Sequence, residues 1–585
     1  MRISKKVLAS LLALSVTGTA TGITVIAATE HWNDATTNSA VSAEWEAWKT
    51  EWETVKNNHE QIVLTPGSDA TKLNFGWYSK TQGSAKVRIA KSNDMSGNTE
   101  FEGTSAESKE IDGQTYYSNK VTAVGLEENT TYYYQYLLNG EWSEVYTYST
   151  KGTDNFSIFY VGDPQIGASK GQIPSTSTEK QTVELAARND SFNWNKTLEA
   201  ATAKFPNVSF LLSAGDQINQ TDVSTPENEL QQAYEYAGFL SPSALKSLPV
   251  ATTIGNHDSM SENYKNHFNN PNSFTEEVSP SIAGNGYYFT YGDVLFMVIN
   301  TNNYNCSDHE NLIKKATEAN PDVKWKVVMF HQDIYGSGLD HSDSDGMVLR
   351  TQLTPIFDKY DIDVVLQGHD HTYSRTYQLT GDGESHQAFT SGDQKLDNFL
   401  SENNCYSIVD TTQNVVTDPE GTIYMEANSA TGSKFYELIP TQQDYIAARS
   451  QTWTPTYSVI DFKTAEDGST TSFTINTYDV ETGAQIDDSY TIVKTLKEDT
   501  TDTETGTETG TETGAETDTE TGTETGTENG NTNTGNSNTE STDNQQSVNN
   551  EPVATGDTDK TVFAAALAAA AAVISVIFFR KKQES

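Results

Sequence analysis

Apolar runs that end in polar residues recur five times between residues 156 and 371. Phe156 to Val161 leads into Gly-Asp-Pro-Gln, and Val208 to Ala214 leads into Gly-Asp-Gln-Ile-Asn. Leu248 to Ile254 leads into Gly-Asn-His-Asp, Val327 to Phe330 into a histidine, and Val364 to Leu366 into Gln-Gly-His-Asp-His. Helical segments separate the runs, so the pattern predicts an α/β domain whose strand ends share one edge. We expect the five loops to converge on one site.

A different pattern covers residues 61–151, where short alternating strands are interrupted by Gly, Asn and Ser. The segment Leu137-Leu138-Asn139-Gly140 indicates a tight hairpin. This pattern predicts a β-sandwich. Before it, residues 41–57 place three tryptophans on one helical face, which predicts a helix packed on the neighbouring domain. These tryptophans are Trp45, Trp48 and Trp52.

Both ends of the chain differ from the folded part. Basic residues followed by an apolar stretch from Val7 to Ala28 predict a secretory signal peptide. Val562 to Phe579 is uncharged, long enough at ~1.5 Å per residue to span a bilayer, and followed by three basic residues. It is predicted to be a transmembrane helix. Residues 498–550 contain no Lys or Arg and repeat Thr-Glu-Thr-Gly, which is typical of a disordered acidic stalk.

A short motif, Pro552-Val553-Ala554-Thr555-Gly556, precedes the apolar C-terminal segment. The order Thr-Gly, apolar span and basic tail resembles the sortase sorting signals of Gram-positive surface proteins. Those signals have proline two residues before the threonine, whereas here it lies three before. The resemblance implies covalent attachment to the cell wall, and anchoring in the membrane alone is the alternative. Either one implies an extracellular, surface-anchored protein.

Together these patterns predict a multidomain chain. The run from Leu126 to Tyr136 resembles the tyrosine-corner region of fibronectin type III domains. The α/β domain is expected to hold two mixed sheets flanked by helices. The predicted order is a signal peptide at 1–28, a helical segment at 29–59, a fibronectin III-like β-sandwich at 60–152, an α/β domain at 153–496, a disordered stalk at 497–551, and an anchor at 552–585 with its transmembrane helix at 562–579.

The composition narrows the choice of partners. The formal net charge of −44 argues against a nucleic-acid partner bound through a basic patch. It does not argue against a small anionic substrate that metals would hold. The two cysteines, Cys306 and Cys405, could form one disulfide in an exported protein, although an even count does not require it.

The polar residues at the five strand ends are Asp, Asn and His. Carboxylate and amide oxygens together with imidazole nitrogens suit two divalent or trivalent metals that share a carboxylate. On an extended chain, the rings of His369 and His371 would point to the same side and reach one metal pair. The sequence therefore predicts a binuclear metal site.

In this order, the motifs resemble those of calcineurin-like metallophosphoesterases. With the preceding β-sandwich, the chain is most similar to the purple acid phosphatase branch over residues 60–490. The resemblance implies an acid phosphatase-like hydrolase of phosphoric ester bonds that holds two metal ions, Fe, Zn or Mn. It also implies the metal ligands: Asp216 bridges both metals, Asp163 and His371 complete one, and Asn256, His331 and His369 complete the other.

The same resemblance implies the catalytic residues and exposes two departures. His257, paired with Asp258, would contact substrate and act as general acid, and His341 would contact phosphate. Gln165 stands where the broader family has a histidine, and its carbonyl oxygen can still bind a metal. Asn219 stands where purple acid phosphatases have a tyrosine, so we expect no tyrosinate charge-transfer band.

The predicted function is hydrolysis of phosphate monoesters, with nucleotides or other extracellular phosphate esters as substrates. The resemblance implies attack by a metal-bound hydroxide, and His257 would then protonate the leaving oxygen. A phosphodiesterase or nucleotidase on the same core is one alternative. A surface adhesin with a decayed site is an alternative from another class.

Overall fold

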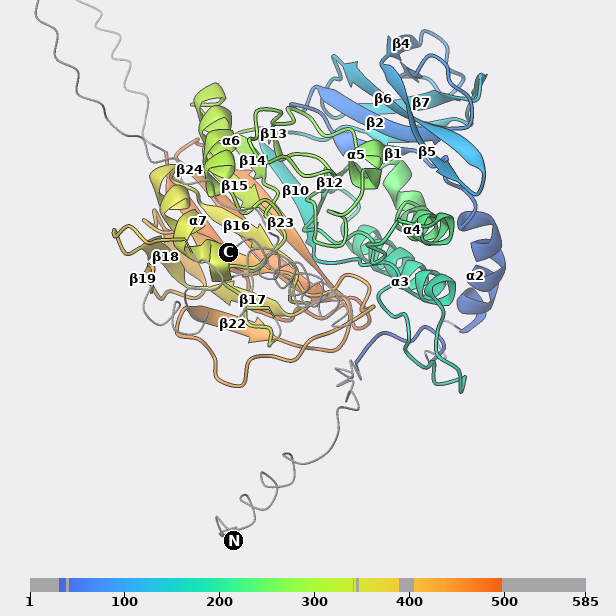
Figure 1. The fold of residues 1–585 in the computed structure, drawn as a ribbon. Coiled ribbons are helices and arrows are strands. Elements are labelled where there is room, and N and C mark those ends of the chain that lie inside the picture. The colour runs from blue at the N-terminus through green and yellow to red at the C-terminus, as the bar shows by residue number, and fades with distance from the viewer. Residues whose placement is uncertain (1–30, 38–41, 340, 343–346, 389–403, 497–585) are drawn as a thin grey trace, which may run out of the picture.

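The computed structural model of the protein describes residues 31–37, 42–339, 341–342, 347–388 and 404–496. The predicted signal peptide, stalk and C-terminal anchor lie outside these residues. No helix in the described part of the chain is both long and apolar enough to cross a membrane. An N-terminal β domain precedes a larger α/β domain, and Figure 1 shows the two side by side.

The N-terminal domain consists of two antiparallel sheets that enclose an apolar core. One sheet has the strand order β1-β2-β6-β5, and the other has the order β4-β3-β7-β8, with β9 also paired to β7. This arrangement confirms the predicted β-sandwich. The strands are β1 Val63–Pro66, β2 Lys72–Ser79, β3 Lys86–Ala90, β4 Thr99–Glu102, β5 Thr104–Ile111, β6 Gln114–Val124, β7 Thr131–Leu138, β8 Glu141–Trp142 and β9 Tyr146–Ser149.

The α/β domain contains two seven-stranded mixed sheets that share one core. The first has the order β12-β11-β10-β23-β24-β25-β20, with β10, β11 and β12 parallel. Its strands are β10 Asn155–Val161, β11 Leu211–Ser213, β12 Val250–Thr252, β20 Val415–Thr417, β23 Thr456–Thr464, β24 Thr470–Asp479 and β25 Tyr490–Thr495. Residues of both sheets, including Ile158, Leu212, Val327 and Leu366, form the shared core.

The second sheet has the order β13-β14-β15-β16-β21-β17-β22, with β14, β15, β16 and β21 parallel. Its strands are β13 Tyr287–Tyr291, β14 Val294–Val298, β15 Trp325–Met329, β16 Val364–Gln367, β17 Tyr373–Thr376, β21 Ile423–Glu426 and β22 Ile446–Ser450. A separate two-stranded antiparallel sheet pairs β18 Gln378–Gly381 with β19 Tyr406–Asp410.

The five predicted strand ends are confirmed as those of β10, β11, β12, β15 and β16. Parallel central strands are buried on both faces, which explains their uninterrupted apolar runs. The runs around β11 and β12 exceed the strands themselves, because flanking residues such as Phe210 and Ile254 are also buried. Tyr160 of β10 fastens the two sheets beside the strand ends, since its hydroxyl donates to the Gln367 carbonyl and accepts from the Gln367 N–H.

Helices cover the outer faces of both sheets. Helix α3, helix α4 and the 3₁₀ turn η2 pack on the first sheet, and α6 and α7 pack on the second. Thr225 caps α4 by accepting a hydrogen bond from the Asn228 N–H at 3.2 Å, and proline follows it at the first helical position. The helices are α2 Ser42–Val55, α3 Val183–Lys204, α4 Pro226–Phe239, η2 Ser243–Lys246, α5 Asn263–His267, α6 Cys306–Ala319 and α7 Met347–Lys359.

Helix α2 carries the three tryptophans predicted to pack on a neighbouring domain. All three are buried in a core with α3, and the Trp48 indole donates to the Arg188 carbonyl at 2.8 Å. This prediction is confirmed. The two cysteines, by contrast, are separate buried thiols, so the disulfide that the sequence allowed is absent. Cys306 is the first residue of α6 and lies in the core beneath that helix, whereas the Cys405 sulfur lies 3.9 Å from the Tyr335 hydroxyl.

Two buried histidines lie where the β-sandwich meets α4. The ring of His267 lies between Tyr78 of the sandwich and Tyr236 of α4, with centroid distances of 4.5 and 4.4 Å. His59 lies nearby, edge-on to Tyr116. Burial lowers the pKa of His59 to about 4, and Lys80 adds to this effect. Burial also lowers the pKa of His267. The domain interface therefore favours neutral imidazoles.

We predict that acidification weakens this interface. The pKa of His59 is about 4 in the folded chain, below its ordinary value of 6.5, so the unfolded chain binds the proton first as the pH falls. This difference lowers the free energy of unfolding by about 2 kcal/mol at pH 5 relative to pH 7. Urea titrations at both pH values measure it. His59→Gln should reduce the pH dependence by that amount, whereas the control His31→Gln, at an exposed histidine, should not. Equal pH dependence in wild type and His59→Gln would contradict the prediction.

Candidate metal centre

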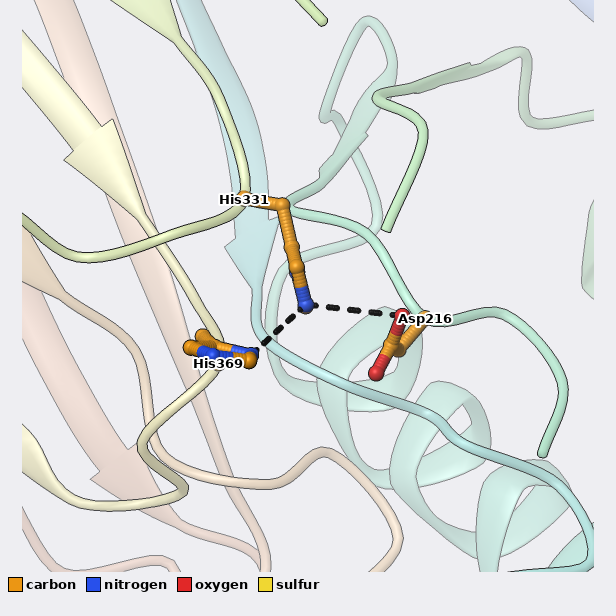
Figure 2. A group of neighbouring side chains, drawn as sticks. All are labelled: Asp216, His331 and His369. Atoms are coloured by element: carbon orange, nitrogen blue, oxygen red, sulfur yellow. Dashed lines mark hydrogen bonds and ion pairs between the residues drawn. The ribbon is translucent and has the colours of Figure 1, made fainter. Parts of the chain in front are cut away.

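The loops after β10, β11, β12, β15 and β16 bring six predicted metal ligands together. His331 lies at the centre of the group, and its Nε2 atom lies 2.8 Å from Asn256 Oδ1 and 3.0 Å from His369 Nδ1. The same Nε2 lies 3.4 Å from Asp216 Oδ1. Figure 2 shows Asp216 and His369 on either side of the His331 ring tip. Gly255 permits this approach, because a Cβ atom there would lie 1.9 Å from Asp216 Oδ1.

The protonation of His331 indicates what this group can bind. His331 Nδ1 lies 2.9 Å from the Ala214 carbonyl, which can only accept, so Nδ1 carries the hydrogen. Nε2 then faces the Asn256 and Asp216 oxygens. Acceptor atoms converge in this way around a cation, and imidazole nitrogen with carboxylate and amide oxygen suits a divalent metal. The residues therefore fit a metal ion at this point.

A second set of donor atoms lies beside the first. Asp163 is fully buried, and its Oδ1 atom has no hydrogen-bond partner within the described residues. This oxygen lies 3.6 Å from His371 Nε2 and 3.7 Å from His331 Nδ1. His371 Nδ1 lies 2.7 Å from the Lys434 carbonyl, so the hydrogen is on Nδ1 and Nε2 faces Asp163. This pair can serve a second cation.

The electrostatics favour positive charge between these residues. Burial lowers the pKa of His331, but the Asp216 and Asp163 carboxylates outweigh it and raise this pKa to about 10. Burial raises the pKa of Asp216, but the imidazoles of His331 and His257 outweigh it and hold this pKa well below its usual value. The carboxylates therefore stabilise positive charge here, and a metal ion would compete with protons for the site.

The conformation predicted for the His-x-His pair is wrong, although both rings reach the site. The segment is not extended, because His369 and His371 have φ values of +81° and +47°. This turn separates the two rings. His369 lies against His331, whereas His371 lies against Asp163.

Gln165 and Asn219 occupy the two positions that depart from the family pattern. Gln165 is fully buried, and its N–H donates to the Asp216 carbonyl at 2.7 Å. A metal contact by its side chain stays a prediction. Asn219 is half-buried, and its backbone carbonyl lies 2.6 Å from His257 Nδ1. The backbone at position 219 thus contacts the predicted general acid.

His257 lies beside the centre. Because a carbonyl only accepts, its Nδ1 carries the hydrogen bonded to Asn219, and its Nε2 lies 3.9 Å from Asp216 Oδ2. The Asp258 carboxylate accepts from the N–H groups of Gly255 and Gln217 at 3.0 and 3.3 Å. The contact that orients the His257 ring at Nδ1 is therefore a backbone carbonyl, and Asp258 shapes the loop.

His341 also lies beside the centre, and its contact with phosphate stays a prediction. Its ring centroid lies 3.8 Å from that of His369, with the two rings tilted by 36°, and its Nε2 lies 3.3 Å from the Tyr436 hydroxyl. Its backbone N–H donates to Asp370 Oδ1 at 3.1 Å. Asp370 belongs to a buried group of carboxylates with Asp333 and Glu426. Asp370 accepts a hydrogen bond from the Ser342 N–H, and Asp333 accepts one from the Ser342 hydroxyl.

The sequence-based prediction missed a sixth loop, residues 427–436 after β21. Its Ser429 hydroxyl donates to the Asp163 carbonyl at 3.1 Å, and its Thr431 hydroxyl donates to the Pro164 carbonyl at 2.8 Å. It also provides the Lys434 carbonyl for His371 and the Tyr436 hydroxyl beside His341. The sequence contained a signal for this loop, because it follows the apolar strand β21 and is itself rich in polar residues.

Family models match both domains. A model of the calcineurin-like phosphoesterases matches residues 156–373. The chain contains a calcineurin-like phosphoesterase domain. A model of the purple acid phosphatase N-terminal domain matches residues 59–150, which form the β-sandwich. Phosphoesterases of this kind use a binuclear metal centre, and the donor atoms in the phosphoesterase domain fit one.

Individual relatives are distant in sequence. Two uncharacterized proteins, from two strains of Mycobacterium tuberculosis, are each 26% identical over 156 residues. The matched region covers 23% of this chain and only 29% of each relative. A purple acid phosphatase from yellow lupin seeds aligns with a TM-score of 0.48 at 14% identity, over 74% of this chain and 75% of that one. A PhoD structure aligns with a TM-score of 0.44 at 12% identity, over 74% and 93%.

We predict that the purified protein binds about two metal ions per chain. Asn256→Ala should lower this to about one, because Asn256 Oδ1 lies 2.8 Å from His331 Nε2, at the predicted position of one of the two ions. Elemental analysis of the dialysed protein measures the metal content. Asn98→Ala, at an exposed position of the β-sandwich, is the control and should retain both ions. Unchanged metal content in Asn256→Ala would exclude Asn256 as a ligand.

Proposed function

We propose that the protein is a secreted, surface-anchored phosphatase that hydrolyses phosphate monoesters with two metal ions. The observation that carries this proposal is the convergence of His331 Nε2, His369 Nδ1, Asn256 Oδ1 and Asp216 Oδ1 on one point. When bound, the metal ions would supply Lewis-acid charge and acidify a water molecule for attack on phosphorus. Asp163, His371 and Gln165 are the proposed ligands that complete the pair.

The chain's own residues would handle the proton and the phosphoryl oxygens. His257 holds one hydrogen on Nδ1 against the Asn219 carbonyl, so a second hydrogen on Nε2 can pass to the leaving oxygen. His341, whose ring contacts that of His369, would hydrogen-bond a non-bridging phosphoryl oxygen. A monoester carries more negative charge than a diester, so charged donors at this site would favour the monoester.

We predict turnover of an aryl phosphate monoester after supply of Fe, Zn or Mn, with a lower rate for the matching aryl diester. Asp216→Asn should reduce kcat more than about 100-fold, because a neutral amide replaces the carboxylate that both metals would share. Asp467→Asn, in an exposed turn, is the matched control. Faster diester hydrolysis would favour the phosphodiesterase alternative. No turnover with any metal, and no difference between wild type and Asp216→Asn, would contradict the enzymatic proposal.

The surface location is supported by the apolar segments at residues 7–28 and 562–579 and by the sortase-like motif around Thr555. We predict that detergent fails to extract the wild-type protein from cell walls of a Gram-positive host. Thr555→Ala should make it extractable, because the threonine would provide the wall linkage. Thr558→Ala is the control. Equal resistance to extraction in both variants would contradict covalent attachment and leave membrane anchoring.

A further inference from the structure

A buried glutamate of α4 contacts the loop that follows β11. Glu235 is fully buried, and its Oε2 atom accepts the N–H groups of Asn219 at 2.8 Å and Gln220 at 2.6 Å. The Asn219 N–H also lies 3.0 Å from the Ile166 carbonyl. Glu235 Oε1 has no hydrogen-bond partner within the described part of the chain. Gly167 leaves room for it, since a Cβ there would lie 2.2 Å from this oxygen.

The peptide group between Asn219 and Gln220 connects Glu235 to His257. Its N–H, on Gln220, donates to Glu235, and its C=O, on Asn219, accepts from His257 Nδ1 at 2.6 Å. In a trans peptide these two groups point in opposite directions, so one peptide lies between the carboxyl group and the imidazole. Hydrogen bonds in such a chain polarise one another, and a bond accepted by Glu235 strengthens the Asn219 carbonyl as an acceptor.

We propose that Glu235 is a positioning residue for proton donation by His257 and acts through the peptide between Asn219 and Gln220. This inference rests on the proposed phosphatase function. Glu235 holds the Asn219 carbonyl in place, and that carbonyl fixes the His257 ring with Nε2 toward the metal centre. The arrangement replaces the direct contact between a carboxylate and a histidine with one that includes a peptide group. His257 would therefore keep its hydrogen on Nδ1 and donate the one on Nε2.

Protonation of Glu235 does not remove the contact. Burial raises the pKa of Glu235 to about 8, while the N–H groups of Gln220 and Asn219 and the charge of His257 act in the opposite direction. Oε2 can accept the two N–H groups whether the side chain is a carboxylate or a carboxylic acid. The geometry of the Asn219 carbonyl is thus maintained in both states.

Asp190 of α3 offers a matched control. It is also a fully buried carboxyl group, and its Oδ2 accepts two backbone N–H groups, from Gly167 at 2.9 Å and Ser169 at 3.2 Å. These belong to the loop after β10, which carries Asp163 and Gln165, whereas the carbonyl that accepts from His257 Nδ1 belongs to the loop after β11. Asp190→Ala therefore removes a buried carboxyl group that accepts two backbone N–H groups, as Glu235 does, but from the loop after β10.

Leaving-group dependence tests the proposal, because a general acid matters most for poor leaving groups. Glu235→Ala in the metal-loaded protein should lower kcat about 100-fold for an alkyl phosphate such as glycerol 2-phosphate. It should lower kcat less than about threefold for 4-nitrophenyl phosphate, whose leaving group needs no proton. Glu235→Gln, whose amide oxygen accepts the same N–H groups, should restore most of the alkyl phosphate activity. Asp190→Ala should affect both substrates equally.

Equal losses on both substrates in Glu235→Ala would overturn the proposal. Should Glu235→Ala be unfolded, Glu235→Leu fills the space without an acceptor and takes its place. Nitrogen NMR of ¹⁵N-histidine-labelled protein tests the contact without turnover, with the His257 signals assigned from His257→Gln. We expect the Nδ1–H signal of His257 to shift in Glu235→Ala and not in Asp190→Ala. An unchanged signal would overturn the proposal. If the wild-type protein shows no turnover but Glu235→Ala still shifts the His257 signal, only the phosphatase function is refuted.

Discussion

The metal centre depends on backbone turns that most residues disfavour. Asp163, Gln165, Asp216, His369 and His371 all have φ values between +30° and +81°. For residues other than glycine, this left-handed region costs about 1–2 kcal/mol each. Contacts between neighbouring loops stabilise the turns, as where the Gln165 N–H donates to the Asp216 carbonyl. As a result, the chain reverses directly after β10, β11 and β16, and the donor side chains meet.

Backbone carbonyls determine the hydrogen positions on three of the histidines. Ala214, Asn219 and Lys434 each offer a carbonyl to an Nδ1 atom, of His331, His257 and His371 respectively. In each case Nε2 is left to face the centre. The three residues need have no particular side chain, so the chemistry of the site depends on the course of the main chain as much as on its histidines.

The strand ends could be predicted from the sequence because burial on both faces requires uninterrupted apolar runs. The polar residues that follow identified six metal-ligand candidates that the structure brings together. The turn at His369 and His371 could not be predicted, because neither residue signals a positive φ as glycine would. The apolar strand before the sixth loop was visible in the sequence, but the contact of Tyr436 with His341, in the loop after β15, arises only on folding. The pairing of Cys306 and Cys405 was undecidable from their number alone.

Helix α4 faces two ways, and this has a consequence for how the protein can be divided. On one side it presents Glu235 to the loop beside the metal centre. On the other, Tyr236 packs on His267 and the Ala237 carbonyl accepts from Gln61 at 2.7 Å, next to the β-sandwich. The β-sandwich is therefore not expected to be replaceable by an unrelated domain. Joining the α/β domain to a different partner would remove contacts from one side of the helix that supports the proposed proton donor, so the two domains are expected to be inherited as a unit.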